Sequence, residues 1–187
     1  MLSILRRYLL VPATEEKDDF AILVMRVRTN RSLTTRLRRR TGGTMIFQFD
    51  DGGRTLAGYR GLAGDCVIRA VAIATQQPYQ TVYDALSEGC RTQRHTRRSR
   101  RKVSARDGVR IQRQWFKRYM ERLGWRWTPT MGIGTGCRVH LKADELPSGR
   151  LIVNVSKHML AVIDGVIHDT YEDQRGGTRC VYGYWSQ

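Results

Sequence analysis

Apolar residues run almost without interruption through the stretch CVIRAVAIA, residues 66–74. A helix on a protein surface carries polar residues along one face, so a run this even predicts a helix that is buried on most sides. A second helix is expected over PYQTVYDALSEG, residues 78–89. Pro78 suits a first helical turn, and Val82 and Leu86 recur four residues apart on an inward face with Tyr79.

A third helix is predicted in VRIQRQWFKRYMERLG, residues 109–124. Apolar side chains recur there every four residues, which predicts a stripe facing the core, and Gly124 suits the end of the helix. The stripe consists of Ile111, Trp115, Tyr119 and Leu123.

The last part of the chain has the pattern of β-strands. Two apolar segments flank Asp164-Gly165, a pair of residues typical of a two-residue type I′ hairpin turn. Helices followed by antiparallel strands indicate an α+β fold. The expected strands are RLIVNVS (150–156), HMLAVI (158–163), VIHDTY (166–171) and RCVYGYW (179–185).

The predicted hairpin brings two polar residues together. With a two-residue turn Ile163 pairs with Val166, and side chains then alternate between the faces of the sheet. His158 and Asp169 become diagonal neighbours on one face, roughly 7–8 Å apart at Cα. An aspartate in that place can accept the imidazole N–H and stabilise an imidazolium, whereas His168 points to the other face.

Cys66 stands where the first helix begins, directly after Asp65. Unpaired backbone N–H groups at a helix N-terminus favour an anion, and a nearby histidine cation lowers the pKa of a thiol. Cys66, His158 and Asp169 are therefore candidate nucleophile, general base and orienting residue. The alternative is structural: a cysteine in an apolar helix is most often a small buried side chain, and the histidine and aspartate can be ordinary strand residues.

The phrases GDCVIRAVAIAT (64–75) and SKHMLAVIDGVIHDTY (156–171), in the order Cys, His, Asp, resemble the papain-like cysteine peptidases. The likeness is greatest to compact bacterial and phage members, including bacteriocin-processing and transglutaminase-like enzymes. It implies a papain-like core, in which N-terminal helices with the cysteine at a helix start pack on a C-terminal antiparallel sheet. It also implies a hydrolase or acyl transferase that attacks a peptide, isopeptide or amide carbonyl through an acyl-enzyme.

One feature of that family is missing. Its members usually have a glutamine shortly before the cysteine that helps to hold the oxyanion, whereas this chain reads YRGLAGDC over residues 59–66. Arg60 stands near the expected position and is a weak candidate for oxyanion or substrate binding. The backbone N–H of Cys66 is a further candidate donor. No cofactor is expected.

The chain has 187 residues, of which 41% are hydrophobic, enough for one compact domain. We expect this domain at residues 45–187, preceded by a basic, flexible arm at 1–44. An alternative for the arm is an over-extended translation start. An arginine-rich insertion is expected at about 91–107.

The net charge of +16 is concentrated in two segments. Residues 91–118 hold twelve basic residues and one acid, and residues 1–44 carry +6, so the rest of the chain is close to neutral. The arginine-rich loop is the candidate contact for nucleic acid or another acidic partner, the alternative being a solvated loop. The alternative to an enzyme is a non-catalytic nucleic-acid-binding protein of a phage or mobile element that uses this loop, although a basic loop is also compatible with an enzyme, where it could gate or recruit substrate. The candidate residues are Arg94, Arg97, Arg98, Arg100, Arg101 and Lys102.

No apolar run reaches the roughly 20 residues that a membrane span needs, and no signal peptide is recognisable, so no membrane partner and a cytoplasmic location are expected. The four cysteines form no CxxC pair and are expected to be reduced. A zinc site is a competing hypothesis, because CRTQRH (90–95) and CRVH (137–140) offer four ligands. The alternative is two unrelated thiols and two solvated histidines.

Overall fold

The structure is a computed structural model that describes residues 44–93 and 104–187. All of these residues belong to one compact unit, Arg38–Gln187, and they form the expected α+β fold. The helices are α1 (Cys66–Thr75), α2 (Tyr79–Thr92) and α3 (Gln114–Arg122), with short 3-10 turns η1 (Ala105–Asp107) and η2 (Arg175–Gly177). The strands are β1 (Ile46–Phe49), β2 (Arg126–Pro129), β3 (Arg150–Val155), β4 (His158–Ile163), β5 (Val166–Asp169) and β6 (Val181–Ser186).

The six strands form one sheet in the order β1-β5-β4-β3-β6-β2. The expected C-terminal antiparallel sheet is therefore only part of it. Strand β1 precedes the helices and pairs in parallel with β5, while β2 follows α3 and pairs antiparallel with β6. Both added strands lie at the edges, have only four residues, and leave several side chains exposed, so they carry little of the alternation that identifies a strand.

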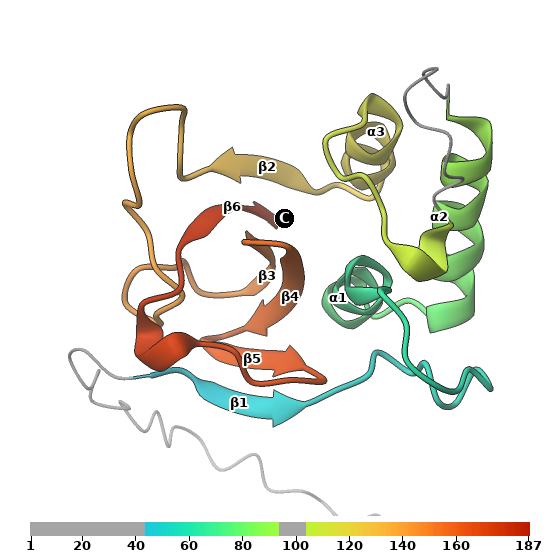
Figure 1. Ribbon diagram of the computed structural model, residues 1–187, viewed down its shortest axis with the longest axis horizontal. Coiled ribbons are helices and arrows are strands. Elements are labelled where there is room, and N and C mark those ends of the chain that lie inside the picture. Colours follow the sequence, from blue (N-terminus) through green and yellow to red (C-terminus); the bar gives the residue numbers. More distant parts are fainter. Residues whose placement is uncertain (1–43, 94–103) are drawn as a thin grey trace, which may run out of the picture. The chain divides into compact units, whose positions relative to one another are not determined.

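Helix α1 is the centre of the fold. It packs on β3, β4 and β5 and on α2, and the helices lie on one side of the sheet (Figure 1). Seven of its ten residues are buried, which is why the apolar run in its sequence has no polar face. Its first residue, Cys66, is only partly buried and stands at the rim of this packing.

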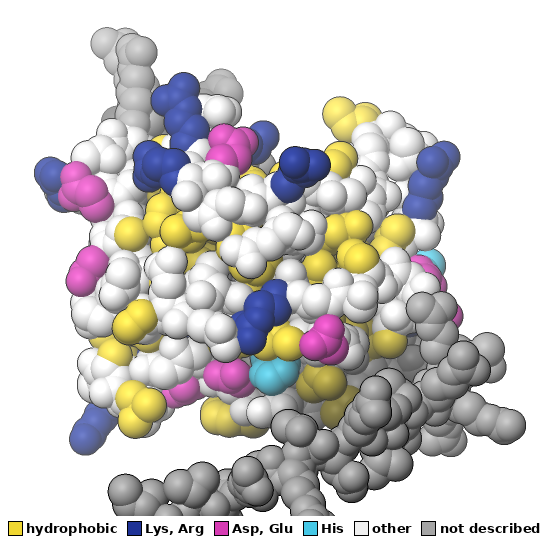
Figure 2. All heavy atoms as spheres, turned by 180° about the vertical axis from the view of Figure 1, so that it is seen from behind, with side chains coloured by type: hydrophobic (Ala, Val, Ile, Leu, Met, Phe, Trp, Pro, Cys, Tyr) yellow, Lys and Arg dark blue, Asp and Glu magenta, His cyan; other side chains and the backbone are white. Residues whose placement is uncertain are grey.

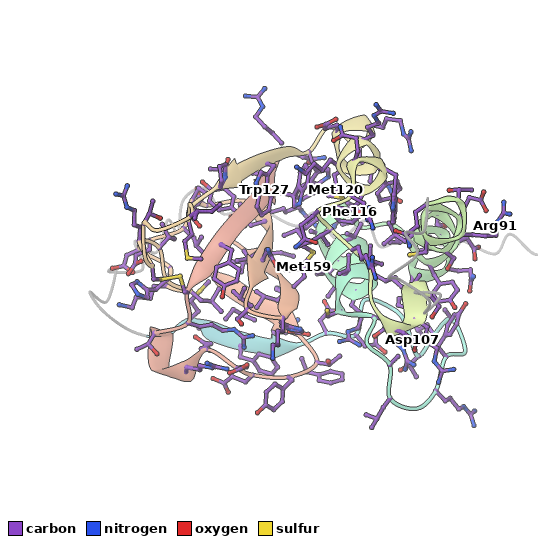
Figure 3. All side chains as sticks on the ribbon, turned by 45° about the horizontal axis from the view of Figure 1, so that its top comes forward. Arg91, Asp107, Phe116, Met120, Trp127 and Met159 are labelled. Atoms are coloured by element: carbon purple, nitrogen blue, oxygen red, sulfur yellow. A yellow bond between two sulfur atoms is a disulfide. The ribbon has the colours of Figure 1, made fainter. Side chains whose placement is uncertain are left out.

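Helix α3 differs from its prediction. It begins at Gln114, so Ile111 lies in the turn before it, and its fully buried side chains are Phe116 and Met120. These two side chains point toward Met159 of the sheet (Figure 3). The expected stripe is only partly buried, because Trp115 is directed at α2. The two helices are so close there that a Cβ atom added to Gly89 would lie 2.3 Å from the Trp115 ring.

The β4–β5 hairpin agrees with its prediction. Asp164 and Gly165 have positive φ values of 49° and 82°, as a type I′ turn requires. Ile163 pairs with Val166, and the register continues without a slip to the pair of Ala161 and His168. The positions that the sequence assigns to His158 and Asp169 therefore hold in the structure.

The expectation that all four cysteines are reduced is wrong. Cys137 and Cys180 form a disulfide with a Cα–Cα distance of 5.7 Å, and Cys66 and Cys90 are free. The partners are 43 residues apart, so their spacing carries no signal. They meet because His140 forms an isolated β-bridge with Cys180.

No helix among residues 44–93 and 104–187 is both long enough and apolar enough to cross a membrane.

We expect Cys137→Ser to lower the free energy of unfolding by about 2–4 kcal/mol, because the disulfide no longer restricts the unfolded chain. Urea denaturation of the full chain measures this loss, and the double variant Cys137→Ser/Cys180→Ser should lose the same amount. Thiol counting in denaturant without reductant should find only the two free cysteines. Four reactive thiols, or an unchanged stability, would contradict the bond.

Candidate active site

Three elements bring Cys66, His158 and Asp169 together. Cys66 begins α1, His158 begins β4, and Asp169 ends β5. The imidazole Nε2 of His158 is hydrogen-bonded to Oδ2 of Asp169. The thiol of Cys66 lies close enough to this ring for each group to shift the pKa of the other. Since Nε2 is occupied by the aspartate, Nδ1 is the ring atom left for the sulfur.

The cysteine and the histidine shift each other's pKa. Burial of the Cys66 thiol raises its pKa, but the hydrogen bond and charge of His158, the Met159 N–H and the charge of Arg69 together outweigh this effect. The pKa of Cys66 is therefore below its ordinary value. Burial lowers the pKa of His158, but the hydrogen bonds to Asp169 and Cys66 raise it to about 9. A thiolate–imidazolium pair is the expected state between these two values.

Asp169 is held from several directions. Its side chain is 4% exposed, and Oδ1 accepts the backbone N–H of Thr170 at 2.7 Å. Its carbonyl oxygen accepts the backbone N–H of Asp50 at 2.9 Å, which attaches β5 to the residue after β1. The carboxylate can therefore hold the His158 ring in one orientation.

The residue directly before Cys66 in the sequence has a buried carboxylate. Asp65 is 1% exposed and occupies the position before α1, but its side chain does not cap the helix. It instead forms ion pairs with Arg54, at 2.8 Å, and Arg69, and it accepts a hydrogen bond from the Tyr79 hydroxyl. Burial and this hydrogen bond raise the pKa of Tyr79, so its hydroxyl stays protonated.

The thiol opens into a cleft of about 570 Å³. One wall is the segment from Asp107 to Gln112, which leads into α3, and the other is formed by β3, the β3–β4 turn and Tyr182 of β6. The residues that line it are Ala63, Gly64, Cys66, Val67, Arg69, Asp107, Gly108, Val109, Arg110, Ile111, Gln112, Asn154, Val155, Lys157, His158, Met159 and Tyr182.

Arg60 is not among the residues that line this cleft. It is exposed, and its carbonyl oxygen accepts a hydrogen bond from Arg54 at 3.2 Å. The structure thus brings the three main candidates together without the weak one. The reason is local, because the segment before α1 turns toward Arg54 and Tyr59 rather than toward the thiol.

The arginine-rich insertion is described only at its two ends. Helix α2 continues to Thr92, and η1 begins at Ala105. The six basic candidates lie in residues 94–103, outside the described residues, so nucleic-acid or acidic-partner binding through residues 91–118 stays a prediction. On the face shown in Figure 2, the visible lysine and arginine side chains are scattered among uncharged ones.

The zinc hypothesis loses one of its ligands, because the sulfur of Cys137 is bonded to Cys180. Cys90 lies on the buried face of α2 and is 3% exposed, and burial raises the pKa of its thiol. Among residues 44–93 and 104–187, no group of three or more potential metal-binding side chains forms.

Most residues of the cleft were not predicted from the sequence. Asp65 has the position and residue type of a helix N-cap, which concealed its role in ion pairing. Lys157 could have been found, since it lies in the link between two predicted strands and directly before His158. Gln112 and Asn154 carried no signal, because only the folded chain brings them beside the cysteine.

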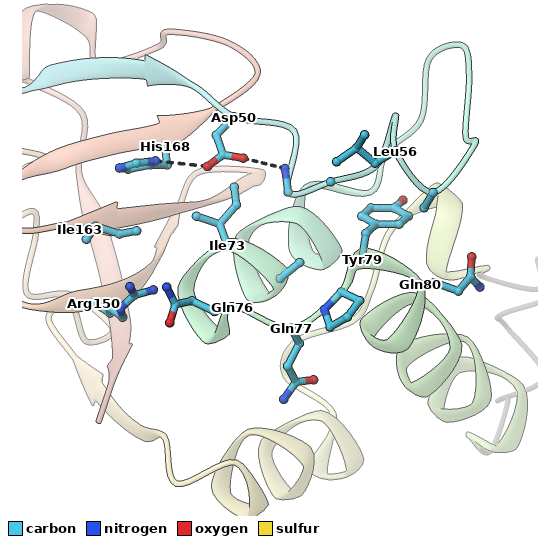
Figure 4. Close-up of a pocket in the computed structure, with 15 residues that line it drawn as sticks. Asp50, Leu56, Ile73, Gln76, Gln77, Tyr79, Gln80, Arg150, Ile163 and His168 are labelled. Atoms are coloured by element: carbon cyan, nitrogen blue, oxygen red, sulfur yellow. Dashed lines mark hydrogen bonds and ion pairs between the residues drawn. The ribbon is translucent and has the colours of Figure 1, made fainter. Parts of the chain in front are cut away.

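A second hollow, of about 700 Å³, is lined by Ile73 and Gln76 at the far end of α1 (Figure 4). His168 lines it, as strand alternation predicts, and its Nδ1 lies 3.2 Å from Oδ2 of Asp50. Arg150 and Gln76 face each other across its floor in Figure 4. This hollow contains none of the residues hydrogen-bonded to Cys66.

No protein-family model, curated protein or solved structure matches the chain. The resemblance to papain-like peptidases therefore rests on the residues of the two phrases alone. The site has to be interpreted from its own geometry.

Asp65→Asn should lower the free energy of unfolding by about 3–5 kcal/mol, because it leaves two largely buried arginines without their carboxylate. Urea denaturation of the full chain measures the loss. Asp84→Asn is the matched control: Asp84 is exposed on α2, and its change should cost less than about 0.5 kcal/mol. Equal effects of the two substitutions would contradict the importance of the buried cluster.

Proposed function

We propose that this protein is a cysteine hydrolase or acyl transferase that acts through Cys66, His158 and Asp169. The observation that carries the proposal is the hydrogen bond of the His158 imidazole to a buried carboxylate, in a cleft that the Cys66 thiol also lines. It supplies a nucleophile, a base and an orienting group in contact with one another. The lowered pKa of the thiol and the raised pKa of the imidazole agree with this arrangement.

In the first step the Cys66 thiolate attacks the carbonyl carbon of a peptide, isopeptide or amide, and the carbonyl oxygen takes the negative charge. The His158 imidazolium then gives its proton to the leaving amine as the C–N bond breaks, which leaves a thioester on Cys66. Neutral His158 next removes a proton from water or from an acceptor amine that attacks the thioester, and the C–S bond breaks to release the product and restore the Cys66 thiolate beside the imidazolium. Asp169 holds the ring and stabilises its charged form throughout.

The developing oxyanion needs hydrogen-bond donors near the sulfur. The backbone N–H groups at the start of α1 have no side-chain cap, and the amides of Asn154 and Gln112 line the same cleft. These groups are the available donors in place of the glutamine that the papain-like family usually has before its cysteine.

A papain-like frame is part of the proposal. It is supported by the chain order Cys66, His158, Asp169 and by the helix that starts at the cysteine and packs on the strands that carry the other two residues. The parallel strand β1 and the insertion between α2 and α3 are features that the resemblance did not imply.

Cys66 should react with iodoacetamide at neutral pH much faster than an ordinary thiol. The full chain is alkylated at several pH values, and the peptide that contains Cys66 is quantified by mass spectrometry. As the pH is lowered, the rate should begin to fall at a lower pH than for an ordinary thiol, because the pKa of Cys66 is lowered. His158→Ala removes the cation while the thiol stays desolvated, so the rate at pH 7 should fall at least about 10-fold.

His140→Ala is the matched control, because His140 binds Glu145 and lies outside the cleft. It should leave the pH profile of Cys66 unchanged. A profile that rises only near the pKa of a free thiol, about 8.5, and is insensitive to His158→Ala would contradict the proposed function.

A further inference from the structure

The cleft beside Cys66 has an excess of positive charge. Three basic side chains line it: Arg69 from α1, Arg110 from the segment before α3, and Lys157 from the β3–β4 turn. The one acidic side chain in the lining is Asp107, whose carboxylate accepts a hydrogen bond from the Ser104 hydroxyl at 2.8 Å. The cations come from both walls, so their fields add within the cleft.

The buried cluster behind the cysteine does not cancel this charge. Asp65 carries one negative charge and forms ion pairs with both Arg54 and Arg69, while Tyr79 is protonated and neutral. The charges of Asp65 and Arg54 cancel, so the net charge of about +1 left on the cluster is that of Arg69, which is already counted among the three cations of the cleft. The charge of Arg69 also contributes to the lowered pKa of Cys66, so it acts at the sulfur.

One hydrogen-bond donor of the Arg69 guanidinium, its Nε, is unpaired in the described part of the chain. Its Nη1 binds Asp65, but its Nε is buried and has no hydrogen-bond partner in the described part of the chain. An unpaired buried donor costs free energy, so the hydrogen bonds of the fold do not fully satisfy the Arg69 guanidinium.

Lys157 occupies a backbone conformation that usually favours glycine or asparagine. Its φ is 58°, in the left-handed region, and it is the residue directly before His158. Glycine would relieve this strain, so the turn itself does not explain a lysine here. The side chain is exposed and lines the cleft, which gives the residue a use beyond the turn.

We propose that the cleft takes acyl substrates that carry a carboxylate close to the scissile carbonyl, and that Lys157 and Arg69 attract and orient this carboxylate. A peptide with an aspartate or glutamate beside the cleaved bond is the substrate class that fits. This inference rests on the proposed function, since it concerns the acyl group that Cys66 attacks.

Iodoacetate and iodoacetamide test the charge preference without a known substrate. Both alkylate a thiolate, but iodoacetate carries a carboxylate next to the reacting carbon. For the full chain at low ionic strength, the ratio of the Cys66 rate with iodoacetate to that with iodoacetamide should exceed the ratio of a neutral cysteine peptide by about 3- to 10-fold. Salt at about 0.5 M should remove most of this excess.

Lys157→Gln should lower the ratio by about 2- to 5-fold, because it removes one cation from the cleft. Lys157→Arg should keep the ratio high. Lys117→Gln on α3 is the matched control, because it removes the same charge outside the cleft and should leave the ratio unchanged. Urea denaturation confirms that each variant is folded.

A ratio equal to that of the neutral peptide and unaffected by Lys157→Gln would overturn the charge preference. If iodoacetamide still reacted in a His158-dependent way in that case, the proposed function would stand without this substrate class. Loss of the His158 dependence would overturn the proposed function and this inference together.

Discussion

The register of the β4–β5 hairpin is the constraint on which the candidate site depends. Asp164 and Gly165 accept positive φ values, so the strands are joined by two residues and Ile163 pairs with Val166. A slip by one residue would turn every side chain of one strand to the opposite face. The contact of His158 with Asp169 therefore follows from a turn at the other end of the hairpin, and α1 only has to bring Cys66 to the same edge.

Two opposing effects set the charge states of Cys66 and His158: burial favours the neutral forms, and the neighbouring group favours the charged forms. Burial alone would keep both Cys66 and His158 neutral, yet each is shifted toward its charged form because the other lies beside it. Asp65 follows the same rule, since a carboxylate that is 1% exposed is tolerated through its two arginines and Tyr79. Charge is thus concentrated at one end of α1, while the remainder of this helix is apolar.

Sequence patterns predicted the features that depend only on neighbouring residues, such as helix faces and the hairpin register. The apolar run that begins at Cys66, the inward face of α2, and the diagonal relation of His158 to Asp169 each depend on periodicity or on a two-residue turn. Features that depend on distant segments were missed or wrong: β1 pairs with a strand 120 residues later, Cys137 pairs with Cys180, and α3 turns Phe116 rather than Trp115 into the core. Asp65 was missed because one short side chain can either cap a helix or bind arginines, and only the fold decides.

The ring closed by Cys137 and Cys180 contains both His158 and Asp169 but not Cys66. Cys66 carries a free sulfur, whereas the loop that carries His158 and Asp169 is closed by an oxidised pair. An oxidant that converts a low-pKa thiol to sulfenic acid would inactivate Cys66, while a reductant would open this loop and leave Cys66 a thiol. The two sulfur sites therefore respond in opposite directions to a change in redox conditions.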